Sequence, residues 1–107
     1  MTPYIQVVTT TENREDAEKI ARALVEDRLA ACVQLLGPIE STYWWKGSIE
    51  TAREWVCHIK THESLYDELE RTIKAIHPYE TPEIIAMSIV AGSNDYLKWL
   101  GREVRKP

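Results

Sequence analysis

The spacing of hydrophobic residues changes once within the first thirty residues. Residues 4–10, YIQVVTT, form a short run rich in β-branched and aromatic side chains, which is typical of a β-strand. From residue 13 onward, hydrophobic side chains recur three and four positions apart, and this spacing predicts an amphipathic helix that ends near residue 28. The side chains on its apolar face are Ala17, Ile20, Ala21, Leu24 and Val25.

Two extended segments follow, residues 29–45 and residues 48–61, and they meet at Lys46 and Gly47. Glycine can adopt the positive φ that a tight hairpin turn requires, so these segments predict a long β-hairpin. Gly37-Pro38 interrupts the first arm. Because proline has no N–H to donate, we expect a bulge or bend at this point and an edge position for this arm.

The second half of the chain repeats the alternation of helix and strand. A second amphipathic helix is expected to end at His77-Pro78, because the residue before a proline disfavours helical geometry. Residues 84–90, IIAMSIV, form an apolar run of strand length, and Ser93 or Asn94 can cap a short last helix. The apolar positions of the two helices are Leu65, Leu69, Ile73 and Ile76 in the first, and Tyr96, Leu97, Leu100 and Val104 in the second.

The predicted order is βαββαβ followed by a terminal helix. This order matches the ferredoxin-like α+β plan, a four-stranded antiparallel sheet with two helices on one face. The chain has 107 residues, of which 44% are hydrophobic and 28% charged, as in an ordinary folded protein. We therefore expect a single domain that spans residues 1–107.

The predicted hairpin is long for a domain of this size. A compact domain of this length has a diameter of roughly 35 Å, whereas arms of fourteen to sixteen residues would reach about 45 to 50 Å. The tip carries three successive aromatic residues, Tyr43, Trp44 and Trp45. We expect the tip to overhang and pack on another subunit of a symmetric oligomer. The alternative is that Tyr43 and Trp45 fold back over their own sheet.

Charge and targeting signals narrow the possible partners. The formal net charge is -4, which argues against nucleic acid as a ligand because there is no basic excess to neutralise phosphates. No apolar run approaches the ~20 residues of a membrane span, and the first residues do not resemble a secretion signal, so we expect a cytoplasmic protein. Cys32 and Cys57 lack CxxC spacing and are interpreted as buried thiols.

Common activities of ferredoxin-like domains lack their signatures here. The residues after the first strand, TTTENR, contain neither the cysteine pair of a copper chaperone nor the glycine of a phosphate-binding loop. Serine, cysteine and histidine residues occur without a recognisable nucleophile elbow or oxyanion motif. The sequence therefore predicts a protein that is not an enzyme.

The most distinctive motif is HPYETPE at residues 77–83. His77 could cap the preceding helix or bind a metal ion, and Glu80 and Glu83 could supply oxygen ligands to the same Cu²⁺ or Zn²⁺ ion. Lys60, near the end of the second hairpin arm, is either a surface lysine with its stem buried or the partner of an anion.

Five motifs are spread along the chain: RLAACV at 28–33, YWWKG at 43–47, IKT at 59–61, HPYETPE at 77–83 and YLKWL at 96–100. Together they resemble the CutA divalent-cation tolerance family, and the resemblance spans nearly the whole chain. It implies a ferredoxin-like subunit in a tight homotrimer, with hairpins that pair across subunits, clefts between subunits as in the PII signalling trimers, and an association with copper and other divalent cations. Some members carry a histidine before the HPYETPE motif and a cysteine in the first strand, where this chain has Ile76 and, approximately, Thr9.

The resemblance and the residues predict a non-enzymatic homotrimer for divalent-cation binding and tolerance. Copper or zinc, bound by His77 and Glu83, would not be required for folding. One alternative is a PII-like sensor whose clefts receive a small anionic metabolite, with Lys60 as its charge partner. Another is a trimeric scaffold for partner proteins. The residues expected to bind the ligand in the clefts are Trp45, Lys60, His77, Tyr79 and Glu83.

Overall fold

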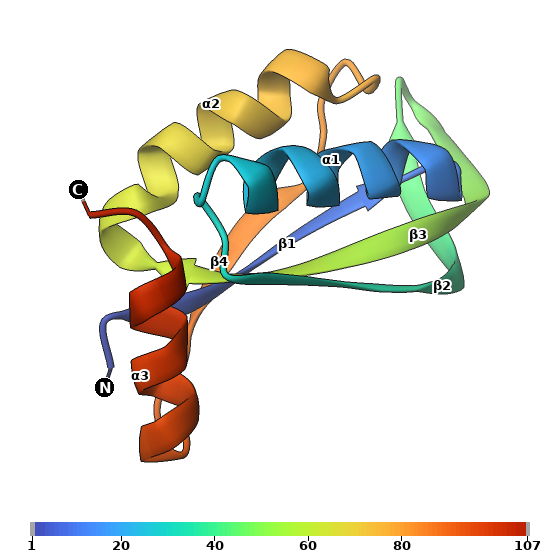
Figure 1. Cartoon of the computed structure of the whole chain (residues 1–107). Coiled ribbons are helices and arrows are strands. Elements are labelled where there is room, and N and C mark those ends of the chain that lie inside the picture. Colours follow the sequence, from blue (N-terminus) through green and yellow to red (C-terminus); the bar gives the residue numbers. More distant parts are fainter. Residues whose placement is uncertain (1, 107) are drawn as a thin grey trace.

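The computed structural model describes residues 2–106 and contains the predicted succession of strands and helices (Figure 1). The strands form one four-stranded antiparallel sheet in the order β2-β3-β1-β4. This topology confirms the ferredoxin-like α+β prediction. The elements are β1 (Tyr4–Thr11), α1 (Arg14–Glu26), β2 (Cys32–Trp45), β3 (Ser48–His62), the 3-10 turn η1 (Glu63–Leu65), α2 (Tyr66–Ile76), β4 (Ile84–Ser88) and α3 (Asn94–Glu103).

Helices α1 and α2 lie on one face of the sheet, and α3 lies apart from them beside the start of β1 (Figure 1). The hydrophobic core fills the space between the sheet and the first two helices. Val7 of β1 and Ile59 of β3 are fully buried there, as are Leu24 of α1 and Ile73 of α2. The opposite face of the sheet has no such helical layer over most of its area.

The two cysteines differ in their environment. Cys57 lies in the core cluster on β3 and is fully buried, and Cys32 at the start of β2 is half-buried. Burial raises the pKa of the Cys57 thiol from 9.0 to about 11, because the charged thiolate is poorly solvated in the core. The prediction of a buried thiol is confirmed for Cys57 and is wrong for Cys32, which lies at the start of the edge strand β2 and is only half-buried.

The hairpin has the predicted irregularity in its first arm. The pairing of β2 with β3 shifts register between Leu36 and Ile39, the Gly37-Pro38 peptide is cis, and β2 is an edge strand. Beyond this bulge the hairpin curves upward past the end of β1, as Figure 1 shows on its right-hand side. The bend limits its reach, and the longest dimension of the whole domain is 44 Å.

Three predicted boundaries differ from the structure by two residues or more. Helix α1 ends at Glu26, because Arg28 takes a positive φ of 55° and the N–H of Leu29 returns to the Leu24 carbonyl at 2.9 Å. This turn occupies the residues before Cys32, so β2 begins three residues later than predicted. Strand β4 ends at Ser88, two residues earlier than the apolar run suggests.

Candidate functional site

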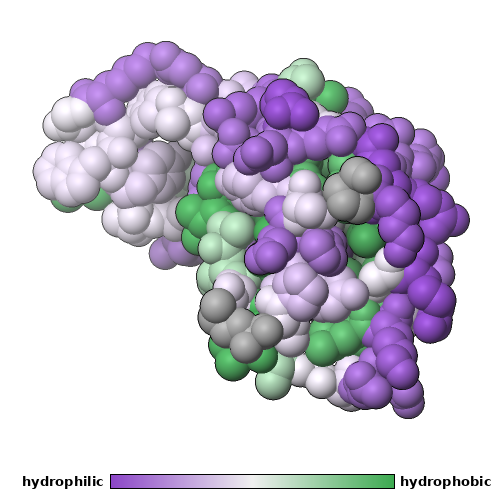
Figure 2. Space-filling model, turned by 90° about the vertical axis from the view of Figure 1, so that its left-hand side faces the viewer, coloured by the Kyte–Doolittle hydropathy of each residue, from purple (hydrophilic) through white to green (hydrophobic). Residues whose placement is uncertain are grey.

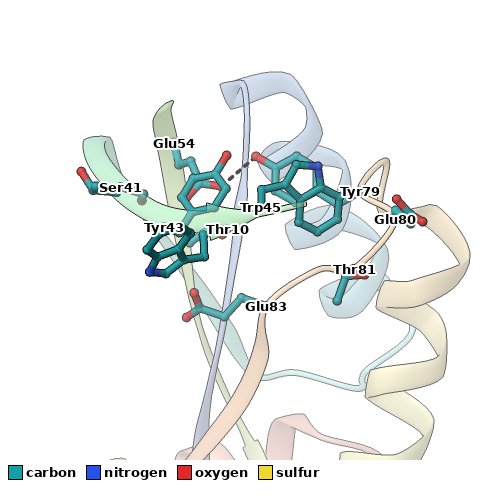
Figure 3. A pocket seen from close by; sticks show the side chains of 11 residues that line it. Thr10, Ser41, Tyr43, Trp45, Glu54, Tyr79, Glu80, Thr81 and Glu83 are labelled. Atoms are coloured by element: carbon teal, nitrogen blue, oxygen red, sulfur yellow. Dashed lines mark hydrogen bonds between the residues drawn. The ribbon is translucent and has the colours of Figure 1, made fainter. Parts of the chain in front are cut away.

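A pocket lies between the hairpin tip and the HPYETPE loop, where the curved hairpin returns toward its own chain (Figure 3). Its volume is about 720 Å³, within the range of ~300–1,000 Å³ that is usual for small-molecule sites. It is lined by Thr10 at the end of β1, residues 41–45 of β2, Glu54 of β3, and residues 79–81 and 83 of the loop before β4. Four segments distant in the sequence thus meet at one place.

The structure brings together three of the five predicted ligand-binding residues. Trp45, Tyr79 and Glu83 all line the pocket. Lys60 lies elsewhere, paired in register with Cys32 of β2, and its ammonium group contacts the side-chain oxygen of Gln34. Lys60 therefore does not join this pocket within one chain.

His77 is buried behind the pocket and does not line it. Its Nε2 is 2.8 Å from the carbonyl oxygen of Thr10, and its Nδ1 accepts a hydrogen bond from the backbone N–H of Tyr79 at 3.1 Å. A backbone N–H needs an acceptor, so Nδ1 carries the lone pair and Nε2 donates its proton to Thr10. Both ring nitrogens are engaged, and in this geometry His77 has no free lone pair for a metal ion. Its side chain ties the loop to β1.

Glu54 is a pocket residue that the sequence reasoning did not select. The Tyr79 hydroxyl donates a 2.7 Å hydrogen bond to Glu54 Oε2, and only 7% of Glu54 is exposed. Sequence alternation places Glu54 on the mixed face of the hairpin arm, with Val56 and His58, where a glutamate is usually solvated. Its burial depends on the bent hairpin and on the loop that carries Tyr79, and neither leaves a signal near residue 54.

The surroundings of Tyr79 disfavour its ionised form. Burial of the phenol is the main reason that the pKa of Tyr79 is raised above its usual range, and the hydrogen bond to Glu54 and the charge of that carboxylate raise it further. Tyr79 therefore stays a hydrogen-bond donor to Glu54 at neutral pH.

An ion pair joins the hairpin tip to the loop at the rim. Lys46 Nζ lies 3.5 Å from Glu80 Oε2 and 5.4 Å from the centroid of the Trp45 ring. Exposed pairs of this kind contribute only about 0–1 kcal/mol. Tyr43 and Trp45 thus face the loop of their own chain, while Trp44 remains 72% exposed. Packing of the tip on another subunit stays a prediction.

The lining of the pocket is acidic and aromatic. The charged residues among its lining are Glu54, Glu80 and Glu83, with no lysine or arginine among the described residues that form the wall. Such a pocket attracts cations and repels anions. However, residues 2–106 of one chain contain no group of three or more His, Cys, Asp or Glu side chains placed to hold a metal ion. The donors of a single chain therefore do not fit a metal centre.

Tyr79→Phe is expected to lower the free energy of unfolding by about 1–2 kcal/mol at pH 7, because Glu54 loses its hydrogen-bond donor while it remains buried. A raised pKa in the folded state means that the contribution of Tyr79 is fully present below pH ~10 and is lost as the pH rises further. The difference between wild type and variant should therefore narrow above pH 10. Urea unfolding at pH 7, 9 and 10.5, followed by circular dichroism, measures this difference in the free energy of unfolding.

Tyr43→Phe is the matched control for this prediction. Tyr43 lines the same pocket, and residues 2–106 provide no hydrogen-bond partner for its hydroxyl. Its replacement should change the free energy of unfolding by less than about 0.5 kcal/mol. A difference between wild type and Tyr79→Phe that is the same at all three pH values would contradict the assignment of Tyr79 as the donor to Glu54.

None of the helices within residues 2–106 combines the length and the apolar character needed to cross a membrane.

Comparison with known proteins gives a consistent result. The family described as CutA1 divalent ion tolerance protein matches residues 5–103. A rice protein named Protein CutA 1, chloroplastic, is 42% identical over 104 residues, which are 97% of this chain and 59% of the rice protein. The chain thus spans little more than half the length of this plant relative.

Two further matches cover nearly the full length of both proteins. The divalent-cation tolerance protein CutA of Pyrococcus horikoshii is 42% identical over 102 residues, 95% of this chain and 99% of its own. The crystal structure of CutA1 from Oryza sativa matches with a TM-score of 0.95 and 42% identity, and covers 99% of this chain and 97% of that chain. This chain therefore belongs to the CutA1 divalent ion tolerance protein family.

Proposed function

We propose that the chain is a non-enzymatic, cytoplasmic homotrimer that acts in divalent-cation tolerance. It binds a divalent cation, with copper as the first candidate and zinc as the second. The observation that supports a cation as the ligand is the pocket lining. Glu54, Glu80 and Glu83 line a cavity whose described wall contains no basic residue. The family supports the association with divalent cations. A PII-like sensor of an anionic metabolite has less support, because Lys60 lies outside this acidic pocket.

A trimer is supported by the face of the sheet that α1 and α2 leave open. Leu36, Ile85 and Met87 are 45–50% exposed on this face, where Val8 of β1 is paired with Ile85 and Val56 of β3 with Leu36. Figure 2, which views the molecule from the side that carries the termini, shows hydrophobic residues at the surface among hydrophilic ones. Exposed hydrophobic side chains on a sheet face that no helix covers are typical of a subunit interface.

Light scattering coupled to size-exclusion chromatography should give a mass of about 37 kDa, three times the 12.4 kDa of one chain. Ile85→Glu should dissociate the trimer, because it places a charge on the open sheet face and breaks an interface made of hydrophobic residues. Val25→Glu is the matched control, because Val25 is 42% exposed on α1, away from that face. A monomeric wild type, or an Ile85→Glu variant with the wild-type mass, would rule out this interface.

The proposed metal site needs ligands from more than one chain, because residues 2–106 of a single chain provide no group of three or more placed to hold a metal ion. Glu83 is the better candidate of the two predicted metal ligands, since both nitrogens of His77 are hydrogen-bonded. Calorimetric titration should show Cu²⁺ binding to the trimer, and Glu83→Gln should weaken it at least about tenfold. Glu50→Gln, which removes an exposed carboxylate of β3 outside the pocket, should not. Equal isotherms for wild type and Glu83→Gln would reject Glu83 as a ligand.

Metal is not expected to be needed for folding. The core that holds the sheet to α1 and α2 is apolar and is made by one chain. Thermal unfolding of protein treated with a chelator should therefore remain a single cooperative transition.

A further inference from the structure

We infer that the pocket between the hairpin tip and the HPYETPE loop binds a small organic ammonium ion, with the charge received by Glu54 and the carbon groups packed against aromatic rings. The inference shares the acidic pocket of the proposed function, but it requires neither a metal ion nor a neighbouring chain. It concerns the chemical class of the ligand.

The first observation is that the Glu54 carboxylate is buried and has no cationic partner among the described residues. Its side chain is more than nine-tenths buried, and none of the ion pairs formed within residues 2–106 includes it. Oε2 accepts the hydrogen bond from Tyr79, while Oε1 accepts none from the described part of the chain. Buried carboxylates are normally paired with a cation, because loss of hydration is costly for a charge. Glu54 lines the pocket, so a ligand there can supply the cation.

The second observation is the aromatic wall beside Glu54. Tyr43, Trp45 and Tyr79 line the same cavity, and Figure 3 shows their rings around the space next to the Glu54 carboxylate. The residues Tyr43 and Trp45 remain 41% and 37% exposed, so a ligand can reach them. The face of an aromatic ring carries partial negative charge and attracts cations, most strongly when both are withdrawn from water.

The rim of the pocket already shows this combination within the chain. The ammonium group of Lys46 lies near the ring of Trp45 and pairs with Glu80, so one ammonium is shared by an aromatic ring and a carboxylate. Glu54 lines the same pocket as Tyr43 and Tyr79, and the described lining of the pocket contains no basic side chain.

The same features suit an organic cation better than a bare metal ion. A metal ion requires several donor atoms that converge on one point, and residues 2–106 provide no such group. An organic ammonium requires one carboxylate and apolar surface for its carbon atoms. A cavity of about 720 Å³ has room for such a molecule with its substituents.

Matched pairs of charged and neutral probes test this on the wild-type protein. Tetramethylammonium is compared with tert-butanol, and n-butylammonium with 1-butanol, in a buffer that contains a metal chelator. The four tryptophan indole N–H signals in a two-dimensional NMR spectrum report where binding occurs. We expect the signals of Trp45 and its neighbour Trp44 to shift with at least one ammonium probe, at concentrations at least about tenfold lower than with its alcohol. The signal of Trp99, which packs against Tyr96 on α3, should not shift.

Two variants test whether the carboxylate of Glu54 receives the charge of the ammonium ion. Glu54→Gln preserves the shape of the side chain and should weaken ammonium binding at least about tenfold. Glu50→Gln removes an exposed carboxylate of the same strand outside the pocket and should leave it unchanged. Circular dichroism checks that both variants are folded.

The inference is overturned if neither ammonium ion binds, if the alcohols bind as tightly as the ammonium ions, or if Glu54→Gln binds like the wild type. Because the chelator removes metal ions, none of these results depends on the copper titration. A protein that binds Cu²⁺ but no ammonium ion would keep the proposed function and lose this inference.

Discussion

Gly37→Ala is expected to lower the free energy of unfolding by about 2–4 kcal/mol, because a methyl group at this position has no room. A Cβ atom built on Gly37 would lie 2.7 Å from Cε3 of the Trp55 ring and 3.2 Å from the backbone oxygen of Glu54. The φ angle of Gly37 is +155°, a value that residues with a Cβ atom rarely adopt. Either Trp55 or the bent hairpin must move. Urea unfolding measured by circular dichroism gives the change.

Gly47→Ala is the control, because it tests backbone strain without the clash. Gly47 also has a positive φ of +84°, but a Cβ atom there would meet nothing within 4 Å. We expect a loss of about 1 kcal/mol, from the backbone conformation alone. If the two variants lost the same stability, the contact of Gly37 with Trp55 would not be the cause.

His77→Ala is expected to lower the free energy of unfolding by about 3–4 kcal/mol, because it removes a buried ring and two hydrogen bonds together. The carbonyl of Thr10 and the backbone N–H of Tyr79 would both lose their partner. The loop would no longer be tied to the end of β1, so the pocket should lose its shape as well. Urea unfolding measures the loss of stability, and the NMR signal of Trp45 reports the change in the shape of the pocket.

His62→Ala provides the comparison within the same chain. His62 is only half-buried and makes a local hydrogen bond to Ser64 at the start of η1. Its replacement should cost less than about 1 kcal/mol, as for a local cap. If His77 were instead a ligand with a free nitrogen, His77→Ala would leave the stability near that of the wild type and change only metal affinity.

Much of the fold was predictable from local patterns. A three-and-four spacing of apolar side chains marks α1 and α2, and Pro78 ends α2 because the residue before a proline disfavours helical geometry. Pro38 has no N–H to donate, so Gly37-Pro38 was expected at a bulge in an edge strand, and the register shift lies there. These are properties of a residue and its near neighbours, and the sequence carries them directly.

The candidate site was predictable only in part. Trp45, Tyr79 and Glu83 were selected from two motifs, and the structure brings them to one pocket. Their proximity required the hairpin to bend back, which the length of its arms did not indicate. Lys60 was selected for its charge, but its place on β3 is opposite Cys32, away from the hairpin tip.

The sequence by itself determined the order of the elements, the place of the bulge and the family to which the chain belongs, because each depends on residue types at short and regular spacing. Only the tertiary structure decided the roles of His77 and Glu54. His77 reaches the carbonyl of a residue 67 positions earlier, and Glu54 meets the hydroxyl of Tyr79, 25 positions later. The surroundings of a titratable group are set by chain segments that meet only on folding, so neither of these surroundings could be predicted from the sequence. His77 holds the HPYETPE loop to β1 through two hydrogen bonds, and Glu54 is the buried carboxylate of the pocket.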